Sequence, residues 1–299
     1  MHHIDISSNY RAYCLYIIKD SGTFHNNEEI LVEDKYFHIM HLFLRGSFFK
    51  NMFSTLQYYF VVFLLVPGIF IIQVSIVYPD LVMILNASIV KQLMHICLIL
   101  FCFINVVGNM IFSMMMDSSV KQPVFGEGTY CEYCRMPRPA RSWHCKKCKK
   151  CIINRDHHCN FLACCIGLYN QRYFILFLGH TMLCMLITIC YNCYLITLKF
   201  GDDGWILSAA RIINPMLRFV IPEPLGIVDA YVFYLFFNLG VIFWSGSLFF
   251  YYLRNVVTGV TSYEARFPSL MDSSKWKHNL LNVFGYSWYL AIVLAFKKR

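Results

Sequence analysis

Charged residues are scarce in this chain of 299 residues. Asp, Glu, Lys and Arg together make up 14% of it, whereas apolar residues make up 58% and the mean hydropathy is +0.51. A soluble globular domain carries about 25% charged residues, because its surface faces water. The shortage excludes an ordinary soluble enzyme and predicts a protein whose surface is largely covered by lipid.

Proline and glycine are also few, with 9 and 15 residues, and they form no rich segment between the apolar regions. No internal repeat occurs either, which argues against a repeat array or modules joined by a flexible linker. Residues 1–55 contain six acidic and five basic residues ahead of the first long apolar run. This N-terminal arm therefore does not resemble a secretory signal.

Long apolar runs, by contrast, dominate the rest of the chain. A transmembrane helix needs about 20 such residues, and four runs are long enough, at 56–78, 93–116, 173–198 and 231–253. Pro67-Gly68 predicts a kink in the first. Apart from His95 and His180 the runs hold almost no ionisable side chain, which argues against a zinc transporter. We predict an all-α integral membrane protein with four transmembrane helices.

Basic residues predict the orientation of these helices. The arm, the segment between the second and third runs and the C-terminal tail hold 22 of the 26 Lys and Arg residues, against four in the other two loops. Basic loops stay in the cytosol. The predicted organisation is a cytosolic arm (1–55), helices one and two (56–116), a cytosolic Cys-rich domain (117–172), helices three and four with a lumenal loop (173–253), and a cytosolic tail (254–299).

Two segments leave alternatives open. Residues 30–53 fit either an amphipathic helix on the cytosolic leaflet or a loosely ordered arm. Residues 281–296 are apolar but short for a span, so a membrane-associated tail helix is favoured over a fifth span. The net charge of +9 fits a surface that faces anionic lipid headgroups. A nucleic-acid partner is not expected, because it would make no use of the apolar runs.

Cysteine is concentrated in one basic segment between the second and third runs. Residues 131–165 contain eight of the 14 cysteines and three of the 11 histidines. Repeated C-x2-C turns present pairs of ligands to one metal ion, and a structural zinc takes four. In a reducing cytosol such thiols do not form disulfides. The segment therefore predicts zinc sites in the cytosolic domain.

The segment offers more ligands than two zinc ions require. Two tetrahedral sites take eight side chains, so three of the eleven Cys and His residues are surplus. Spacing alone does not say which three, and one zinc ion with scattered cysteines stays open as an alternative.

One run within the segment, Asp156-His157-His158-Cys159, supplies the parts of an activated nucleophile. A cysteine becomes nucleophilic beside a histidine base that a carboxylate orients. One histidine can bind zinc while the other acts as the base. Zinc held by neighbouring ligands would then keep base and nucleophile in place.

The position of Cys159, shortly before the third apolar run, suggests a class of substrate. A thiol at the membrane surface suits a reaction between a lipid-soluble and a water-soluble partner, such as acyl transfer from a fatty acyl thioester. Each buried methylene of an acyl chain contributes about 0.8 kcal/mol, and the basic residues at 146–150 can face an anionic carrier. Residue chemistry alone does not distinguish acyl transfer from other thiol reactions.

The segment resembles the cysteine-rich domain of the DHHC protein S-acyltransferases, whose pattern is C-x2-C-x9-HC-x2-C-x2-C-x4-DHHC-x5-C-x4-N-x3-F. Every fixed position is present, ending in Cys165, Asn170 and Phe174. The four runs, with this segment between the second and third, agree with the family's topology. Thr261-Ser262-Tyr263-Glu264 is similar to the family's TTxE motif, and residues 279–285 are similar to its aromatic C-terminal motif.

The resemblance implies a role for each matched residue. One zinc ion would be bound by Cys131, Cys134, His144 and Cys151, and a second by Cys145, Cys148, His158 and Cys165. Cys159 would be the nucleophile, His157 the general base and Asp156 its orienting partner. The implied reaction has two steps, acylation of Cys159 by fatty acyl-CoA, usually palmitoyl-CoA, and transfer to a cysteine of a membrane-proximal protein.

The chain departs from the family pattern at three places. Asp117-Ser118-Ser119 stands where Asp-Pro-Gly is usual, Asn160-Phe161 replaces Pro-Trp, and Ala163-Cys164 stands where Asn-Asn often precedes the last ligand. The departures indicate a divergent branch, but none removes a ligand or a catalytic group. Cys164 is left as a spare thiol or an alternative ligand.

The family resemblance also implies a cellular location and a set of partners. An endomembrane location, the endoplasmic reticulum or the Golgi, is expected, with both termini in the cytosol and the lipid bilayer, acyl-CoA and protein cysteines as partners. The alternative interpretation is a catalytically weak zinc-domain membrane adaptor, that is, a pseudoenzyme. Intact Asp156, His157 and Cys159 favour the enzyme.

Overall fold

The computed structural model describes most of the chain that follows the N-terminal arm. The described residues are 56, 59–123, 129–201, 205–222, 224–266, 272–286 and 288–293. The arm at 1–55, with its possible amphipathic helix at 30–53, lies outside the described residues, and so does the basic end of the tail.

Four helices in the described part of the chain are long and apolar enough to cross a membrane. The first, Val66–Leu85, consists of α4 (Val66–Ile72), η2 (Gln73–Val77) and α5 (Tyr78–Leu85), and the others are α6 (Ile89–Met115), α7 (Gln171–Phe200) and α10 (Ile227–Val257). The predicted fold class, four transmembrane helices with the Cys-rich domain between the second and third, is confirmed.

The first two helices lie closer together along the chain than predicted. The first continues past Tyr78 to Leu85 and ends where Asn86 adopts a left-handed conformation, with φ of 45°. The second begins at Ile89. Pro79 does not stop the first helix, because proline is tolerated in the first turn of an α-helical segment, and a short turn at Asn86 suffices to reverse the chain.

The kink predicted at Pro67-Gly68 coincides with a change of helix type. Residues before it form the π-helix η1 (Phe60–Leu65), and α4 begins at Val66, so Pro67 occupies its first turn. Proline lacks the N–H that a continuous α-helix would need there, and a wider π turn accommodates that loss.

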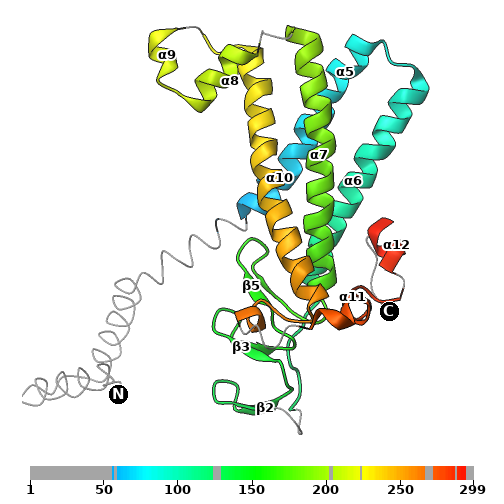
Figure 1. The fold of residues 1–299 in the computed structure, drawn as a ribbon, viewed down its shortest axis with the longest axis vertical. Helices are drawn as coiled ribbons and strands as arrows, with labels where there is room; N and C mark the ends of the chain where they lie inside the picture. The colour runs from blue at the N-terminus through cyan, green and yellow to red at the C-terminus, as the bar shows by residue number, and fades with distance from the viewer. Residues whose placement is uncertain are drawn as a thin grey trace, which may run out of the picture. The chain divides into compact units, whose positions relative to one another are not determined.

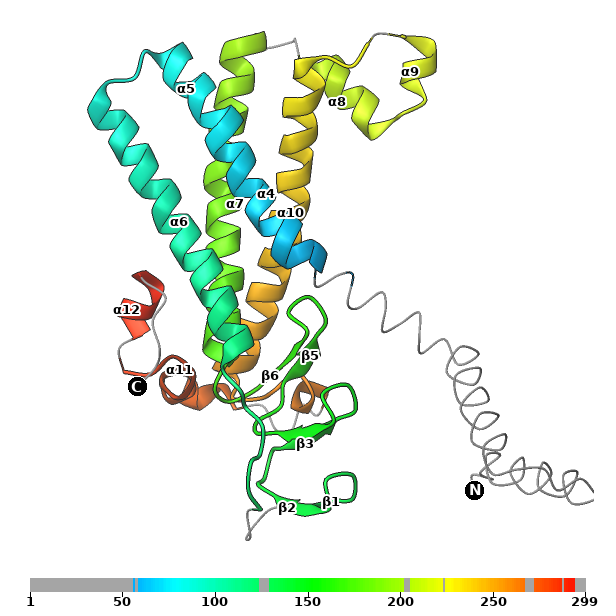
Figure 2. The same cartoon turned by 180° about the vertical axis from the view of Figure 1, so that it is seen from behind.

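Helix α7 occupies the middle of the bundle, between α6 and α10 (Figures 1 and 2). In the apolar 18-residue stretch of α7, 61% of the residues are buried. The corresponding stretches have 22% in Val66–Leu85, 33% in α6 and 28% in α10. The outer helices therefore present most of their apolar side chains to the lipid, while α7 forms the core.

The Cys-rich domain lies at the end of the bundle where α6 ends and α7 begins (Figure 1). It consists of three antiparallel hairpins, β1–β2 (Thr129–Cys131, Met136–Arg138), β3–β4 (Trp143–Cys145, Lys150–Ile152) and β5–β6 (His157–Cys159, Cys164–Ile166). Their turns contain Arg135, Lys149 and Ala163 with φ between 51° and 55°. Such conformations are uncommon outside glycine, and each of these residues directly precedes the second strand of its hairpin.

Asn170, immediately before α7, joins this domain to the membrane helices. Its buried Nδ2 donates to the Ser113 carbonyl at the end of α6 and to the Cys165 carbonyl of β6, both at 2.9 Å. Its Oδ1 accepts from the Gly167 amide at 2.8 Å. Because these partners come from three segments, one side chain fixes where the hairpins meet the bundle.

Two further regions complete the described chain. On the end of the bundle opposite the hairpins, α8 (Ile206–Ile213) and α9 (Leu217–Val220) connect α7 to α10 (Figure 2). After α10 come the short helices η3 (Glu264–Arg266) and η5 (Ser273–Lys275), then α11 (Trp276–Phe284) and α12 (Trp288–Val293). The predicted single tail helix is interrupted at Gly285, whose φ of 81° ends α11.

We expect Gly167→Ala to destabilise the junction by roughly 1–3 kcal/mol, the usual cost of overpacking. A Cβ at Gly167 would lie 2.6 Å from the Ile153 carbonyl oxygen and 2.7 Å from Ile152 Cγ2. Thermal unfolding of the purified protein in detergent measures the effect. Gly240→Ala in α10 is the matched control, since its Cβ would meet nothing within 4 Å, and equal melting of both variants would contradict the packing account.

Candidate metal centres and catalytic site

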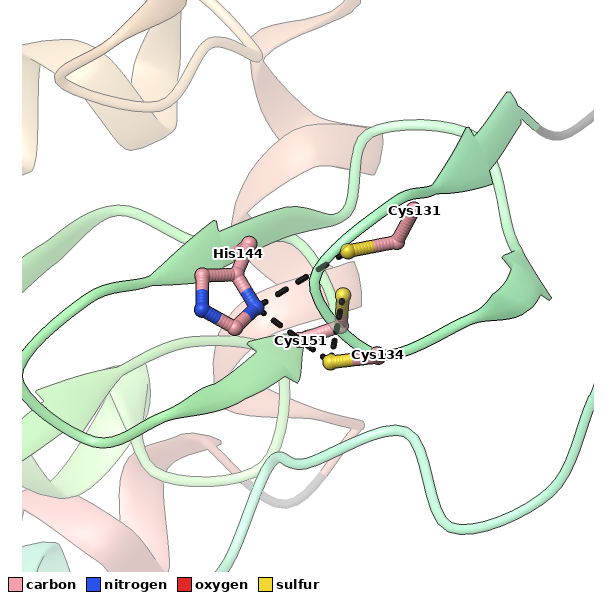
Figure 3. A group of neighbouring side chains, drawn as sticks. All are labelled: Cys131, Cys134, His144 and Cys151. Atoms are coloured by element: carbon pink, nitrogen blue, oxygen red, sulfur yellow. Dashed lines mark hydrogen bonds between the residues drawn. The ribbon is translucent and has the colours of Figure 1, made fainter. Parts of the chain in front are cut away.

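The first group of possible metal ligands lies between the β1–β2 turn and the β3–β4 hairpin. Its ligand atoms, from Cys131, Cys134, His144 and Cys151, all lie within 4.8 Å of one another. Figure 3 shows their side chains pointing toward one centre. His144 Nδ1 lies 3.2 Å from Cys134 Sγ, and the sulfurs of Cys134 and Cys151 are 3.7 Å apart.

The second group, Cys145, Cys148, His158 and Cys165, lies between the β3–β4 and β5–β6 hairpins. His158 Nδ1 is 3.3 Å from Cys148 Sγ and 3.6 Å from Cys165 Sγ. The register explains both groups, since His144 is directly opposite Cys151 and His158 is directly opposite Cys165. Each histidine therefore meets a cysteine across its hairpin, and C-x2-C pairs supply the other two ligands.

Both groups fit a tetrahedral metal ion. With Zn–S bonds of about 2.3 Å, tetrahedral ligand sulfurs lie roughly 3.8 Å apart, close to the 3.7 Å and 3.5 Å between the Cys134–Cys151 and Cys148–Cys165 sulfurs. Burial and neighbouring sulfurs raise the pKa of Cys151 to about 12. A bound cation offsets that effect, because it stabilises thiolates. The two groups can thus hold two metal ions, as the resemblance implied.

Asp156 and His157 form a hydrogen-bonded pair beside these groups. His157 Nδ1 donates to Asp156 Oδ2 at 2.7 Å, and the Asp156 carboxylate is completely buried. Asp156 also accepts from the Ser262 amide and hydroxyl, both at 2.8 Å. The carboxylate thus accepts three hydrogen bonds from two residues, His157 and Ser262. These bonds hold Asp156 in one orientation, and Asp156 in turn orients the imidazole.

Aromatic rings enclose the imidazole of His157. Tyr252 of α10 stacks on it with ring centres 4.9 Å apart, and Phe174 of α7 packs edge-on at 5.1 Å. The Tyr252 hydroxyl lies 3.4 Å from Nε2. Because Nδ1 faces Asp156, Nε2 is the nitrogen free to exchange a proton with a reacting group.

The pKa of His157 reflects this environment. Burial alone lowers it, but the hydrogen bond to Asp156 and the adjacent Cys159 sulfur raise it more, to about 9. At neutral pH the ring therefore holds a proton, and a protonated imidazole can stabilise a thiolate beside it.

Side-chain alternation along β5 separates the two histidines. Successive residues of a strand point to opposite faces, so His158 and its partner Cys165 lie on the metal face. His157, Cys159 and Cys164 share the other face. Adjacent residues in the sequence therefore have different surroundings.

Residues outside the Cys-rich segment complete the site, and sequence reasoning did not assign them roles. Ser262 belongs to the tetrapeptide similar to TTxE, which was only a weak signal. Arg141 donates to Glu264 of the same tetrapeptide and to the Gly259 carbonyl. Although burial alone raises the pKa of Glu264, the Arg141 hydrogen bond holds it below its usual value. This ion pair keeps Ser262 against Asp156.

A groove of about 360 Å³ opens beside the first metal group. Apart from the acidic Glu132, its lining residues are aromatic, basic or metal-ligating: Tyr130, Cys131, Tyr133, Arg138, Trp143, His144, Arg155 and Tyr263. Within the described residues, Arg138 Nε, Arg155 Nε and Trp143 Nε1 are buried without a hydrogen-bond partner. The basic side chains of Arg138 and Arg155, between aromatic residues, suit an anionic group attached to a ring.

Comparison with known proteins identifies the family of this domain. The model of the DHHC palmitoyltransferase family matches residues 124–267. The chain carries a DHHC-type domain. The resemblance seen in the sequence is thereby confirmed, and the matched range includes the hairpins of the DHHC domain, α7, α10 and the tetrapeptide that contacts Asp156.

Curated relatives agree with this assignment. Palmitoyltransferase pfa3 of Aspergillus fumigatus is 35% identical over 103 residues, 34% of this chain and 19% of its own. Probable palmitoyltransferase ZDHHC24 of Mus musculus is 35% identical over 94 residues, 29% of this chain and 33% of its own. Palmitoyltransferase PFA3 of Saccharomyces cerevisiae is 41% identical over 80 residues, 27% of this chain and 24% of its own. The chain thus spans a third or less of these relatives.

We expect His158→Ala and His157→Ala to differ in metal content. His158 Nδ1 faces three sulfurs of the second group, so its loss should release about half of the bound metal. His157 faces Asp156 instead, so its loss should leave the metal content unchanged. Elemental analysis of the two purified variants decides the matter, and equal metal loss from both would refute the separation of the two faces.

Proposed function

We propose that the chain is a protein S-acyltransferase that transfers a fatty acyl group, in the first instance palmitoyl, from acyl-CoA to cysteines of membrane-associated proteins. Cys159 carries the acyl group as a thioester between the two steps. The observation that supports this best is the shared face of β5, where Cys159 adjoins the His157–Asp156 pair and not the metal groups.

In the first step His157 Nε2 takes the proton of the Cys159 thiol, and the thiolate attacks the thioester carbonyl of acyl-CoA. The carbon–sulfur bond to CoA breaks, and the CoA thiolate takes the proton from His157. In the second step a protein thiol gives its proton to His157 and attacks the Cys159 thioester, and Cys159 recovers the proton. One thioester replaces another each time, so the residues mainly position and activate the thiols.

The apolar core below Cys159 supports a fatty acyl substrate. Cys159 is 5% exposed and belongs to the main apolar cluster, with Phe174 and Phe177 of α7. Phe161 packs against Trp244 of α10 with ring centres 5.1 Å apart. A chain that enters this cluster from Cys159 gains about 0.8 kcal/mol for each buried methylene.

The groove beside the first metal group supports CoA as the carrier. Arg138 lies over the Trp143 ring at 5.0 Å, and Trp143 packs against Tyr263 at 4.6 Å. Guanidinium groups bind phosphates, and aromatic faces stack on a nucleobase. Two lining residues are sequence neighbours of the proposed site, since Arg155 precedes Asp156 and Tyr263 follows Ser262. The groove therefore ends near His157 and Cys159.

Zinc is the proposed metal in both groups, because a Cys3His set of this geometry suits a structural zinc ion. Bound zinc would stabilise the hairpins and take no part in acyl transfer.

The proposed location is the membrane of the endoplasmic reticulum or Golgi, with the DHHC domain and both termini facing the cytosol. The basic loops and the family resemblance support this location and orientation.

We expect Cys159→Ser to abolish self-acylation while both metal ions are retained. A serine hydroxyl beside the same base is a far weaker nucleophile toward a thioester than a thiolate. The purified protein is incubated with an alkyne-bearing palmitoyl-CoA, and label released by hydroxylamine is measured alongside metal content. Label of wild-type strength in the variant would refute the assignment of the nucleophile, and no label in the wild type would favour the adaptor.

Arg138→Ala should raise KM for palmitoyl-CoA about tenfold and leave kcat nearly unchanged, since a charge-assisted hydrogen bond contributes about 1.5–3 kcal/mol. The exposed Arg135 is the matched control, because it does not line the groove. Steady-state rates over a range of palmitoyl-CoA concentrations give both constants. An equal rise in KM for both variants would indicate general attraction to the basic domain and not binding in the groove.

A further inference from the structure

Cys164 is directly opposite Cys159 in the β5–β6 hairpin. Side chains opposite each other in an antiparallel pair share a face, with Cβ atoms about 4.5–5.5 Å apart. His158 and Cys165, the next pair, point to the metal face. Cys164 is therefore not one of the eight metal ligands, and it shares the face that carries Cys159 and His157.

The surroundings of Cys164 are apolar and belong to the membrane end of the domain. The half-buried side chain packs against the main apolar cluster, which contains Cys159. Its Sγ lies 3.6 Å from the Ser113 carbonyl in the last turn of α6. A chain attached to this sulfur would thus start at the same apolar core as a chain attached to Cys159.

The turn between the two cysteines keeps them together. Residues 160–163 close the hairpin, with Ala163 in a left-handed conformation, and Lys147 Nζ donates to Asn160 Oδ1 at 2.7 Å. The Ile166 carbonyl on the outgoing strand accepts from the Asp156 amide at 2.9 Å. The first bond ties the turn to the β3–β4 hairpin, and the second joins the two strands at the open end of the β5–β6 hairpin. Both bonds limit any separation of Cys159 from Cys164.

We propose that Cys164 is a second acyl-acceptor site, which takes the fatty acyl group from the thioester on Cys159 by exchange between two sulfurs on the same hairpin face. The inference rests on the proposed function, because Cys159 must first be acylated. Cys164 stands where the family often has asparagine, and the inference gives this departure a chemical role.

The exchange balances without any further reactant. The Cys164 thiol gives its proton to His157, and its sulfur attacks the carbonyl carbon of the Cys159 thioester. The bond from that carbon to the Cys159 sulfur breaks, and the Cys159 thiolate takes the proton from His157. Since one alkyl thioester replaces another, the two acylated forms should differ by no more than about tenfold in population, or 1.4 kcal/mol.

Mass-spectrometric mapping of the acyl sites tests the inference. Wild-type protein in detergent is incubated with an excess of alkyne-bearing palmitoyl-CoA, quenched in acid and digested, and hydroxylamine-sensitive label is assigned to Cys159 or Cys164. We expect label on both, and more than one acyl group per chain, because a vacated Cys159 can be acylated again. Cys164→Ser should carry label on Cys159 alone, with unchanged metal content.

Two further variants separate the outcomes. Cys159→Ser should carry label on neither residue, and Cys190→Ser, which changes an exposed cysteine of α7, should resemble the wild type. Label on Cys159 but never on Cys164 would overturn this inference and leave the proposed function standing. Label on Cys164 in Cys159→Ser, or a disulfide between the two cysteines in place of a thioester, would overturn the transfer from Cys159. An unlabelled wild type would refute the proposed function itself.

Discussion

The alternation of side chains along the β5–β6 hairpin is the constraint on which the candidate site depends. His158 and Cys165 complete a metal group on one face, while His157, Cys159 and Cys164 occupy the other. A shift of the register by one residue would exchange the two faces. Metal bound at this group would therefore do more than stabilise a small domain with little apolar core, since it would hold the register that places His157 and Cys159 on the opposite face.

Contacts from distant parts of the chain complete the surroundings of this hairpin face. Ser262 fixes Asp156 across 106 residues, and Tyr252 covers the imidazole across 95. Asn170 fixes the domain against α6, and the Arg141–Glu264 pair fixes the segment after α10. Loss of any one of these contacts would move the His157 imidazole relative to the apolar core.

Much of this molecule follows from local sequence. Apolar runs predict the four spans because a bilayer requires about 20 apolar residues, and the C-x2-C turns with the DHHC run predict the domain between the second and third spans. The helix ends were less predictable. The first span extends to Leu85 and the tail helix breaks at Gly285, because single left-handed residues decide where a helix stops and hydropathy does not report them.

The sequence by itself determined the membrane class, the number and order of the spans, and the chemical types of the ligands and reacting groups. Only the tertiary structure decided that Ser262 and Tyr252 contact the Asp156–His157 pair and that Cys164 faces Cys159. Composition and spacing specify which groups are available, whereas the direction of a side chain depends on strand register and on contacts between residues far apart along the chain.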